Sequence, residues 1–306
     1  SCHDSFINDW TLKQTYSFAS IFSEGPMDVH RCNKPTGEKA EPAFLYPELG
    51  TIDAKAPRKE RVKQLSEIIT SPKNGRLART VVNRLWAIFF GRGLVDPVDE
   101  MDNPTWNQDL LDWLANDFAD HGYNLKRTMK ILLTSRAYQR PSVRLNEDME
   151  EYVFQGPVVR RLSAEQFLDG IGQVIVAAGK DVPRRHTGGQ RAGMRHLDPL
   201  MRTLGRPKRD VVVTRRESTA TTAQLIELSN GKPFADLMVK GGKAWEGSGH
   251  GADVIVGELF INAIGRVPSE NEVKSAQSIL GAPVNAEGVA DLLWMLAMHP
   301  EFQLIH

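Results

Sequence analysis

The stretch LARTVVNRLWAIFFGRG, residues 77–93, decides the fold class of this 306-residue chain. Its apolar residues recur at intervals of three and four, at Leu77, Val81, Leu85, Trp86 and Phe89. This spacing places them on one face of an α-helix, so the pattern predicts a buried stripe that includes the ring of Trp86. Gly91 and Gly93 follow at the point where such a helix would end.

Signals that start and end helices continue toward the C-terminus. Asn107 and Asn124 are placed to cap two helices, and His121-Gly122 closes the first of them. Two residue pairs have the spacing of a capping box, Ser163 with Gln166 and Ser269 with Glu272. A last helix is expected from about Asn285 through Leu296. The chain is therefore predicted to be mostly α, a helical module with short strand elements and long irregular connectors.

Turn-forming residues predict where the helices are interrupted. Residues 23–60 are rich in Pro, Gly and charge, which favours an extended connector. We therefore expect three parts, with residues 1–24 at the N-terminus, residues 25–57 as the connector, and a helical domain over residues 58–306. One short strand is expected around Val211–Thr214, and the pairs Gly188-Gly189 and Gly241-Gly242 are expected in turns.

The tryptophans fall into two groups. Trp86, Trp113 and Trp294 lie on apolar helical faces, so we expect them in the core. Trp106 and Trp245 stand beside loop residues and could stack on a sugar ring, although packing inside the protein is the stronger expectation.

The overall charge is balanced, but its distribution along the chain is uneven. Lys plus Arg equal Asp plus Glu at 38 each, so the net charge gives no argument for a nucleic-acid partner or an anionic membrane. No apolar run approaches the roughly 18 to 20 residues that span a bilayer. Residues 96–120 carry eight acids and no Lys or Arg, whereas residues 184–216 carry ten bases against two acids. These two segments could attract each other within the fold, or each could face a different partner.

The basic segment holds the candidate ligand-binding residues, which are Arg206, Arg209, Arg215 and Arg216. A guanidinium presents a planar fork of donors that fits carboxylate, sulfate or phosphate, so several that converge on one spot make an anion site. In the alternative, these arginines pair with the acidic stretch between Asp99 and Asp120 or cap the C-termini of helices.

The sequence leaves the catalytic residues unknown. His186, His196 and His250 are available for acid-base chemistry, with Asp198 two residues from His196. The chain contains no H-x-x-x-H, H-E-x-x-H, G-x-S-x-G or Walker pattern. Metal-dependent hydrolysis, serine hydrolysis and phosphate-loop chemistry therefore have no support from motifs.

The first residues carry a separate signal. Ser1-Cys2-His3-Asp4 resembles neither a secretory signal nor a start of translation, so we expect the chain to be a fragment whose start lies upstream. Cys2 and His3 could be the end of a C-x-x-C-H haem-attachment motif whose first cysteine is absent, with His3 as an axial iron ligand. Cys2 and Cys32 could instead form one disulfide in an oxidising compartment, or remain free thiols.

Several runs of residues resemble two families of planctomycetes and verrucomicrobia. The run from Cys2 to Trp10, continuing to Tyr16 and Phe18, resembles the C-terminal end of the cytochrome-like domain of unknown function family 1549. Residues 58–306 resemble its usual neighbour, the domain of unknown function family 1553. The matching runs include Asn83-Arg84-Leu85-Trp86, Gly91-Arg92-Gly93-Leu94-Val95, Leu110-Leu111-Asp112-Trp113-Leu114-Ala115, Arg160-Arg161-Leu162-Ser163-Ala164-Glu165-Gln166, Gly205-Arg206-Pro207, Thr221-Thr222-Ala223-Gln224-Leu225 and His299-Pro300-Glu301-Phe302.

The resemblance implies an extracytoplasmic home, periplasmic or at the cell surface, and a link to electron transfer or polysaccharide processing. It implies haem c at Cys2 and His3 in the full-length parent, but no haem held covalently by this fragment, because the first cysteine of the motif is absent. The expected partners are the upstream cytochrome-like domain and an anionic polysaccharide. Three functions stay open: a non-catalytic structural or docking module, an anionic-glycan-binding module that uses the four arginines, and an enzyme with an unrecognised site. The first function, a structural or docking module, is favoured because it requires no feature beyond those that the sequence shows.

Overall fold

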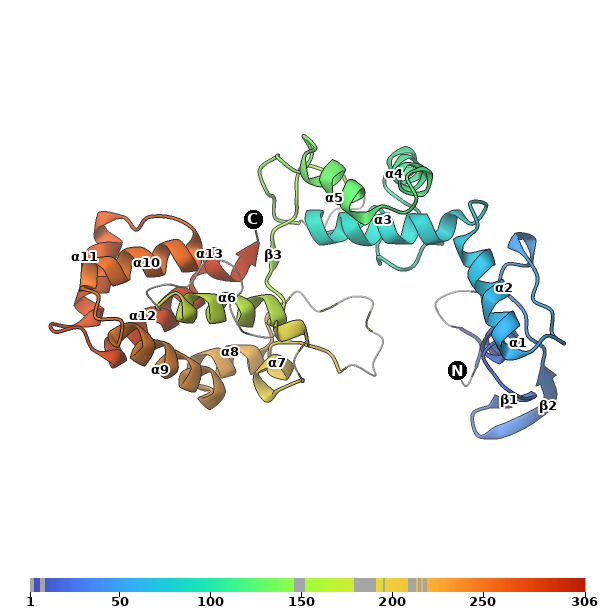
Figure 1. The fold of residues 1–306 in the computed structure, drawn as a ribbon, viewed down its shortest axis with the longest axis horizontal. Helices are drawn as coiled ribbons and strands as arrows, with labels where there is room; N and C mark the ends of the chain where they lie inside the picture. The colour runs from blue at the N-terminus through green and yellow to red at the C-terminus, as the bar shows by residue number, and fades with distance from the viewer. Residues whose placement is uncertain are drawn as a thin grey trace. The chain divides into compact units, whose positions relative to one another are not determined.

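The computed structural model describes residues 3–5, 9–145, 152–178, 191–194, 196–208, 213, 216 and 219–305 (Figure 1). Within these residues the fold is mostly α, as predicted, with two sheets of two short strands each. The elements in chain order are α1 (Leu12–Ser20), β1 (Met27–Arg31), β2 (Lys34–Ala40), η1 (Pro47–Leu49), α2 (Arg58–Thr70), α3 (Gly75–Phe90), α4 (Gln108–Asp120), α5 (Leu125–Leu133), β3 (Arg160–Arg161), α6 (Ala164–Val176), η2 (Ala192–Met194), α7 (Pro199–Thr203), α8 (Thr222–Asn230), α9 (Lys232–Glu246), α10 (Ala252–Ile264), α11 (Glu270–Leu280), α12 (Ala286–Met298), α13 (Pro300–Gln303) and β4 (Leu304–Ile305). No helix among the described residues is long and apolar enough to cross a bilayer.

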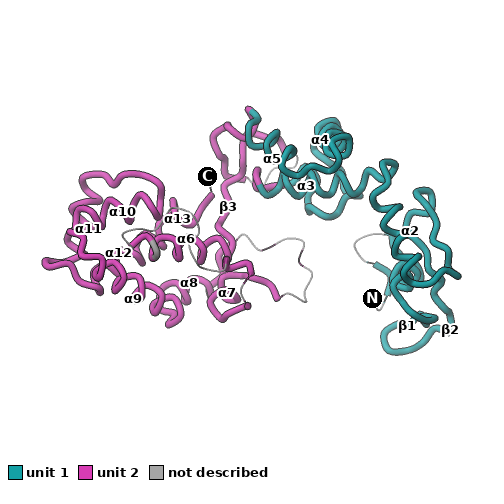
Figure 2. Tube along the Cα trace, in the orientation of Figure 1, with its two compact units in different colours: residues 1–88, 93–135 teal, residues 89–92, 136–306 magenta. Residues whose placement is uncertain are grey.

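The chain divides into two compact units (Figure 2). Unit 1 comprises residues 1–88 and 93–135, and unit 2 comprises residues 89–92 and 136–306. The three-part division expected from the sequence stays a prediction.

The first part of unit 1 contains an antiparallel hairpin inside the segment that we expected to be an extended connector. Strand β1 pairs with β2, with Met27 opposite Ala40 and Arg31 opposite Lys34. The sequence pattern hides this hairpin because almost every side chain of β2 is exposed, so no alternation of apolar and polar residues marks the strand. The hairpin stays attached through a small apolar cluster that joins it to α1, consisting of Leu12, Val29 and Ala40.

The predicted helix is confirmed as α3, but the helix is rotated, so that its buried positions lie about one residue further along the sequence than the predicted ones. The ring of Trp86 is buried, with 4% of its surface exposed, as expected. The fully buried positions, however, are Ala78, Val82, Asn83, Trp86 and Phe90, whereas Leu77, Val81, Leu85 and Phe89 are only half-buried. The rotation follows from a polar requirement, because it turns the amide of Asn83 toward the loop that follows the helix.

Asn83 fixes that loop with four main-chain hydrogen bonds. Its Oδ1 accepts the N–H groups of Leu94 at 2.7 Å and Val95 at 3.1 Å. Its Nδ2 donates to the carbonyl oxygens of Val95 at 2.9 Å and Val98 at 2.8 Å. The side chain is fully buried, so the amide replaces water for four groups that would otherwise be buried without partners.

Both predicted asparagine caps are confirmed in unit 1. Asn107 accepts the N–H of Leu110 at the start of α4, and Asn124 accepts the N–H of Arg127 at the start of α5. The expectation for Trp113 is wrong, since 54% of its surface is exposed. Helix α4 buries Leu111, Leu114, Ala115 and Phe118, and Trp113 lies on the opposite side of the helix.

Unit 2 is built around α9 and α12, with α6, α10 and α11 packed around them. The expectation that Gly241-Gly242 forms a turn is wrong, because both residues lie inside α9. A Cβ atom on Gly242 would lie 2.1 Å from the carbonyl oxygen of Ala286, and one on Gly241 would lie 2.6 Å from Cδ1 of Leu293. The two glycines therefore allow α12 to approach the backbone of α9.

The remaining start signals are confirmed. Ser163 with Gln166 and Ser269 with Glu272 form capping boxes, and Asn285 caps α12. Similar boxes that the sequence reasoning missed start α1, with Thr11 and Gln14, and α8, with Thr221 and Gln224.

The other tryptophans also differ in part from expectation. Trp245 is fully buried and Trp106 packs on Trp86 with ring centroids 6.0 Å apart, so both take the packing alternative. The expectation for Trp294 is wrong, as 40% of its surface is exposed. Its Nε1 donates to the carbonyl oxygen of Leu228 at 2.8 Å, so the ring stays at the surface to satisfy a carbonyl near the end of α8.

Two predicted features fall mainly outside the described residues. Of the expected strand, only Val213 is described, and it belongs to no strand. Gly188-Gly189 is also outside. The short strands of unit 2 are instead β3 and β4, which pair antiparallel through Arg160 opposite Ile305 and Arg161 opposite Leu304.

Candidate functional site

Two of the four predicted ligand-binding arginines converge on one carboxylate, that of Glu165 in the first turn of α6. Arg216 makes a bidentate contact, with Nη1 at 2.6 Å from Oε2 and Nη2 at 3.0 Å from Oε1. Nε of Arg206 lies 3.4 Å from Oε1. The other two, Arg209 and Arg215, lie outside the described residues. The structure therefore shows an arginine cluster whose anion is part of the protein itself.

Arg206 is committed to the fold on every side. Its Nη1 donates to the carbonyl oxygen of Ala192 at 2.8 Å and contacts the sulfur of Met201, and its Nη2 donates to the carbonyl oxygen of Gly193 at 2.9 Å. Only 14% of the side chain is exposed. A guanidinium has five N–H donors, so these contacts leave little for a ligand.

The carboxyl of Glu165 is stabilised as an anion. Burial, the largest single effect, would raise its pKa, but the hydrogen bonds from Arg216 and from its own main-chain N–H lower it. The charges of Arg216 and Arg206 act in the same direction, so the pKa lies below its usual value. Its place in the first turn of α6 also favours negative charge.

Arg206 and Arg216 have Glu165 as their carboxylate partner, whereas one interpretation expected partners in the acidic stretch of residues 96–120. Among the described residues, four acids of that stretch form ion pairs with arginines of unit 1. The ion pairs are Arg76 with Asp102, Arg79 with Asp112, Arg84 with Asp99 and Arg127 with Asp117. Arg206 and Arg216 therefore bind a carboxylate of unit 2, and the four paired acids of the stretch bind arginines of unit 1.

The N-terminal candidate site is described only in part. Cys2 lies outside the described residues, and Cys32 is exposed near the turn between β1 and β2. Nδ1 of His3 lies 2.7 Å from the carbonyl oxygen of Asp4. A hydrogen bond at Nδ1 is the contact that orients an imidazole whose Nε2 binds a metal, so this geometry fits the expected axial ligand.

Asp4 also ties this end of the chain to α1. Its Oδ1 accepts the N–H of Leu12 at 2.6 Å, and the N–H of Ser5 donates to the carbonyl oxygen of Trp10 at 2.9 Å. The ring of Trp10 in turn meets the edge of Tyr46, with centroids 5.0 Å apart. Asp4 and Ser5, which directly follow His3, are therefore held against Trp10 and the start of α1.

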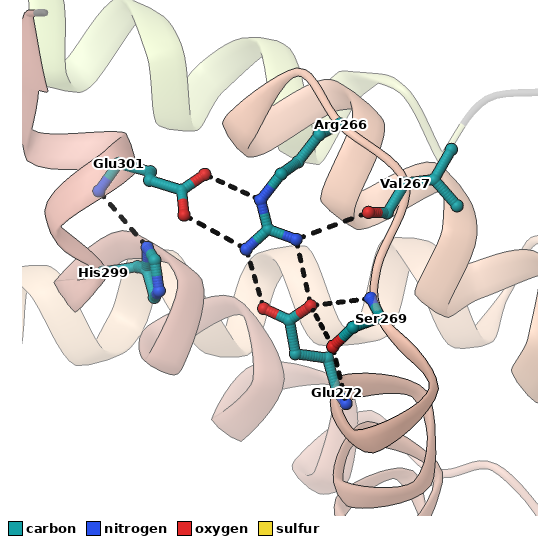
Figure 3. Close-up of polar contacts among 6 residues, drawn as sticks. All are labelled: Arg266, Val267, Ser269, Glu272, His299 and Glu301. Carbon is teal, nitrogen blue, oxygen red and sulfur yellow. Dashed lines mark hydrogen bonds and ion pairs between the residues drawn. The ribbon is translucent and has the colours of Figure 1, made fainter.

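A polar centre that the sequence reasoning missed surrounds Arg266 (Figure 3). Its guanidinium binds Glu272, the capping-box residue of α11, at 2.7 and 2.9 Å, and Glu301 of α13 at 2.8 and 3.1 Å. Hydrogen bonds from Arg266, first among the causes, lower the pKa of both carboxyl groups. His299 caps α13 by accepting the N–H of Glu301 at 3.2 Å. The centre joins the start of α11 to α13, and its donors and acceptors are used within the protein.

The candidate acid-base residues are scattered. His196 is exposed, His250 is half-buried and His186 lies outside the described residues. Asp198, near His196 in sequence, caps α7 by accepting the N–H of Met201 at 2.7 Å. Within the described part of the chain, no group of three or more His, Cys, Asp or Glu residues is placed to hold a metal ion.

Comparison with known proteins places the chain in a family. Residues 61–280 match the family model described as Protein of unknown function (DUF1553). No curated protein and no solved structure matches the chain. The resemblance of the N-terminal residues to the cytochrome-like family 1549 stays a prediction. Because the matched residues make up well over half of the sequence, the chain belongs to the family Protein of unknown function (DUF1553).

Proposed function

We propose that the chain is a non-catalytic structural or docking module of a large exported cytochrome-like protein. The observation that supports this proposal is the state of the arginine cluster. Arg206 and Arg216 bind the internal carboxylate of Glu165, and Arg206 also binds two main-chain carbonyls. A guanidinium that already binds a carboxylate has less to offer an external anion, so the cluster holds α6 in place.

The link to a cytochrome-like protein rests on the residues at the N-terminus. The resemblance of Cys2-His3-Asp4 to a haem-attachment motif supports haem c in the parent, with an extracytoplasmic location and a role near electron transfer or polysaccharide processing. Cys2 and His3 would hold the haem, and the bound group would supply one-electron chemistry. The contact of His3 with the carbonyl of Asp4 supports this assignment.

The alternative, an anionic-glycan-binding module, draws support from Arg216, whose side chain is 43% exposed. Titration calorimetry with polygalacturonate, a uronate-rich glycan, separates the two functions. The structural function predicts no saturable binding by the wild-type chain. Saturable binding that disappears in Arg216→Gln would replace it with the glycan-binding function.

The docking part of the proposal needs a second measurement. The cytochrome-like segment of the parent, matured with haem, should bind this chain when the two are mixed as separate proteins, and analytical ultracentrifugation would show the complex. If the two sediment independently at micromolar concentration, the docking role is wrong.

A further inference from the structure

The outer face of α4 is unusual for a solvent-facing helix surface. Asp109, Trp113, Asn116 and Asp120 follow one another at intervals of three and four, so they form one stripe along the helix, and all four are exposed. More than half of the Trp113 surface faces solvent. A large aromatic ring therefore lies between two carboxylates on the same face. We call this set the α4 stripe.

No residue that the structure describes balances the charge of the α4 stripe. The neighbouring carboxylates on α4 are paired, since Asp112 receives Nε of Arg79 at 2.6 Å and Asp117 receives Nη2 of Arg127 at 2.8 Å. Hydrogen bonds from these two arginines, first among the causes, lower the pKa of both carboxyl groups. Asp109 and Asp120 form no side-chain ion pair or hydrogen bond with any residue that the structure describes. The carboxylates of Asp112 and Asp117 are thus paired with arginines. Those of Asp109 and Asp120 leave negative charge on both sides of Trp113 along the helix.

We propose that the α4 stripe is a docking surface for a basic protein segment that places an Arg or Lys side chain on the indole of Trp113. This inference rests on the proposed docking role and names the chemistry of the partner. A cation over the face of a tryptophan is attracted by the ring, and the two carboxylates add attraction for further positive charges. The same carboxylates repel nucleic acid, anionic glycans and anionic membranes.

The dimensions of the stripe fit a short peptide. From Asp109 to Asp120 the helix rises by about 16 Å at 1.5 Å per residue. An extended chain covers that distance with about five or six residues. A partner with three basic residues spaced along such a segment would meet both carboxylates and the indole together.

The test is a fluorescence-anisotropy titration of the intact chain with a labelled hexapeptide of alternating arginine and alanine. We expect saturable binding that weakens as salt rises, because the carboxylates are exposed. Trp113→Ala should raise the Kd by about threefold to thirtyfold, which corresponds to the usual strength of a cation resting on an aromatic ring. The double variant Asp109→Asn with Asp120→Asn should raise the Kd mainly at low salt. The melting temperature of each variant should stay at the wild-type value, since the changed side chains are exposed.

Matched controls give each outcome a meaning. Asp291→Asn removes an exposed carboxylate from α12 and should leave the Kd unchanged. A hexapeptide of alternating glutamate and alanine should not bind. Absence of saturable binding to the arginine peptide, or a Kd that Trp113→Ala does not change, would overturn the proposal. Saturable binding of cellohexaose that Trp113→Ala abolishes would also overturn it, in favour of a sugar platform. The sedimentation experiment measures complex formation with the cytochrome-like segment separately, so a failure of the α4 stripe is distinguishable from a failure of the docking role.

Discussion

Replacing Asn83 should destabilise unit 1 more than any other single polar change in α3. In Asn83→Ala, the N–H groups of Leu94 and Val95 and the carbonyl oxygens of Val95 and Val98 all lose their partner in a site closed to solvent. Each such hydrogen bond contributes about 0.5 to 1.5 kcal/mol, and four of them give a loss of about 2 to 6 kcal/mol. Water entering the space left by the amide would move the result toward the lower value.

The assay is urea unfolding combined with amide hydrogen exchange. The free energy of unfolding should fall by that amount, and the amides of Leu94 and Val95 should exchange much faster while amides of unit 2 keep their rates. Asn116→Ala is the matched control, because this asparagine is exposed on α4 and its loss should change stability by less than about 0.5 kcal/mol. The reasoning is refuted if Asn83→Ala costs less than about 1 kcal/mol, or if the two amides keep their protection.

Asn83→Asp separates the two halves of the network. The variant keeps an oxygen to accept the two N–H groups but places a carboxylate against the two carbonyl oxygens. Burial without a cation should raise the pKa of the new carboxyl above its unfolded value, so the charged form is the destabilising one. The variant should therefore recover stability relative to wild type as pH falls toward about 4. Unfolding curves at pH 4 and pH 7 measure the difference, and an equal loss at both values would contradict the assignment of the amide orientation.

Three further changes test the core and the arginine cluster. Trp86→Ala should cost about 3 to 5 kcal/mol as a large-to-small core change, measured by urea unfolding, and a cost below about 1 kcal/mol would show that the ring is not buried. Gly242→Ala should lower stability by about 1 to 3 kcal/mol despite the better helix propensity of alanine, because the new Cβ would meet the carbonyl of Ala286; a gain in melting temperature would refute the close approach. Arg206→Gln should lower stability by about 1 to 3 kcal/mol at pH 7, because Glu165 keeps Arg216 but loses its more buried cation. Since the folded pKa of Glu165 is depressed, its contribution is full above the unfolded value near 4.3 and is lost as pH falls through the folded pKa. The difference between wild type and Arg206→Gln should therefore narrow in acid, while the part that comes from the main-chain carbonyls of Ala192 and Gly193 remains.

The sequence predicts best what local side-chain geometry decides. Asn107, Asn124, Ser163 and Ser269 each accept a main-chain N–H from the residue three positions ahead, so their roles follow from spacing alone. The same locality explains why the existence of α3, α4 and α12 follows from the apolar pattern.

What the sequence does not predict depends on partners far along the chain. The rotation of α3 was missed because the pattern gives the presence of an apolar face but not the loop contacts of Asn83, which lie 11 to 15 residues away. Gly241-Gly242 has the composition of a turn, and only the close approach of α12 explains why the two glycines lie inside a helix. The cluster at Glu165 joins residues 51 positions apart, so the arginines could be named in advance but their carboxylate partner could not.

The pairing of β3 with β4 has a consequence for the order in which unit 2 is made. Strand β3 directly precedes α6, the first helix of that unit, yet its partner Leu304–Ile305 follows α13. The N–H of Leu162 likewise waits for the carbonyl of Gln303, and Phe302 fills the core beside Phe167. During synthesis, the start of unit 2 therefore leaves the ribosome long before the residues that complete it. The unit cannot close progressively from its N-terminus, and a chain stalled before α13 would expose an unpaired strand and an unfilled core to chaperones.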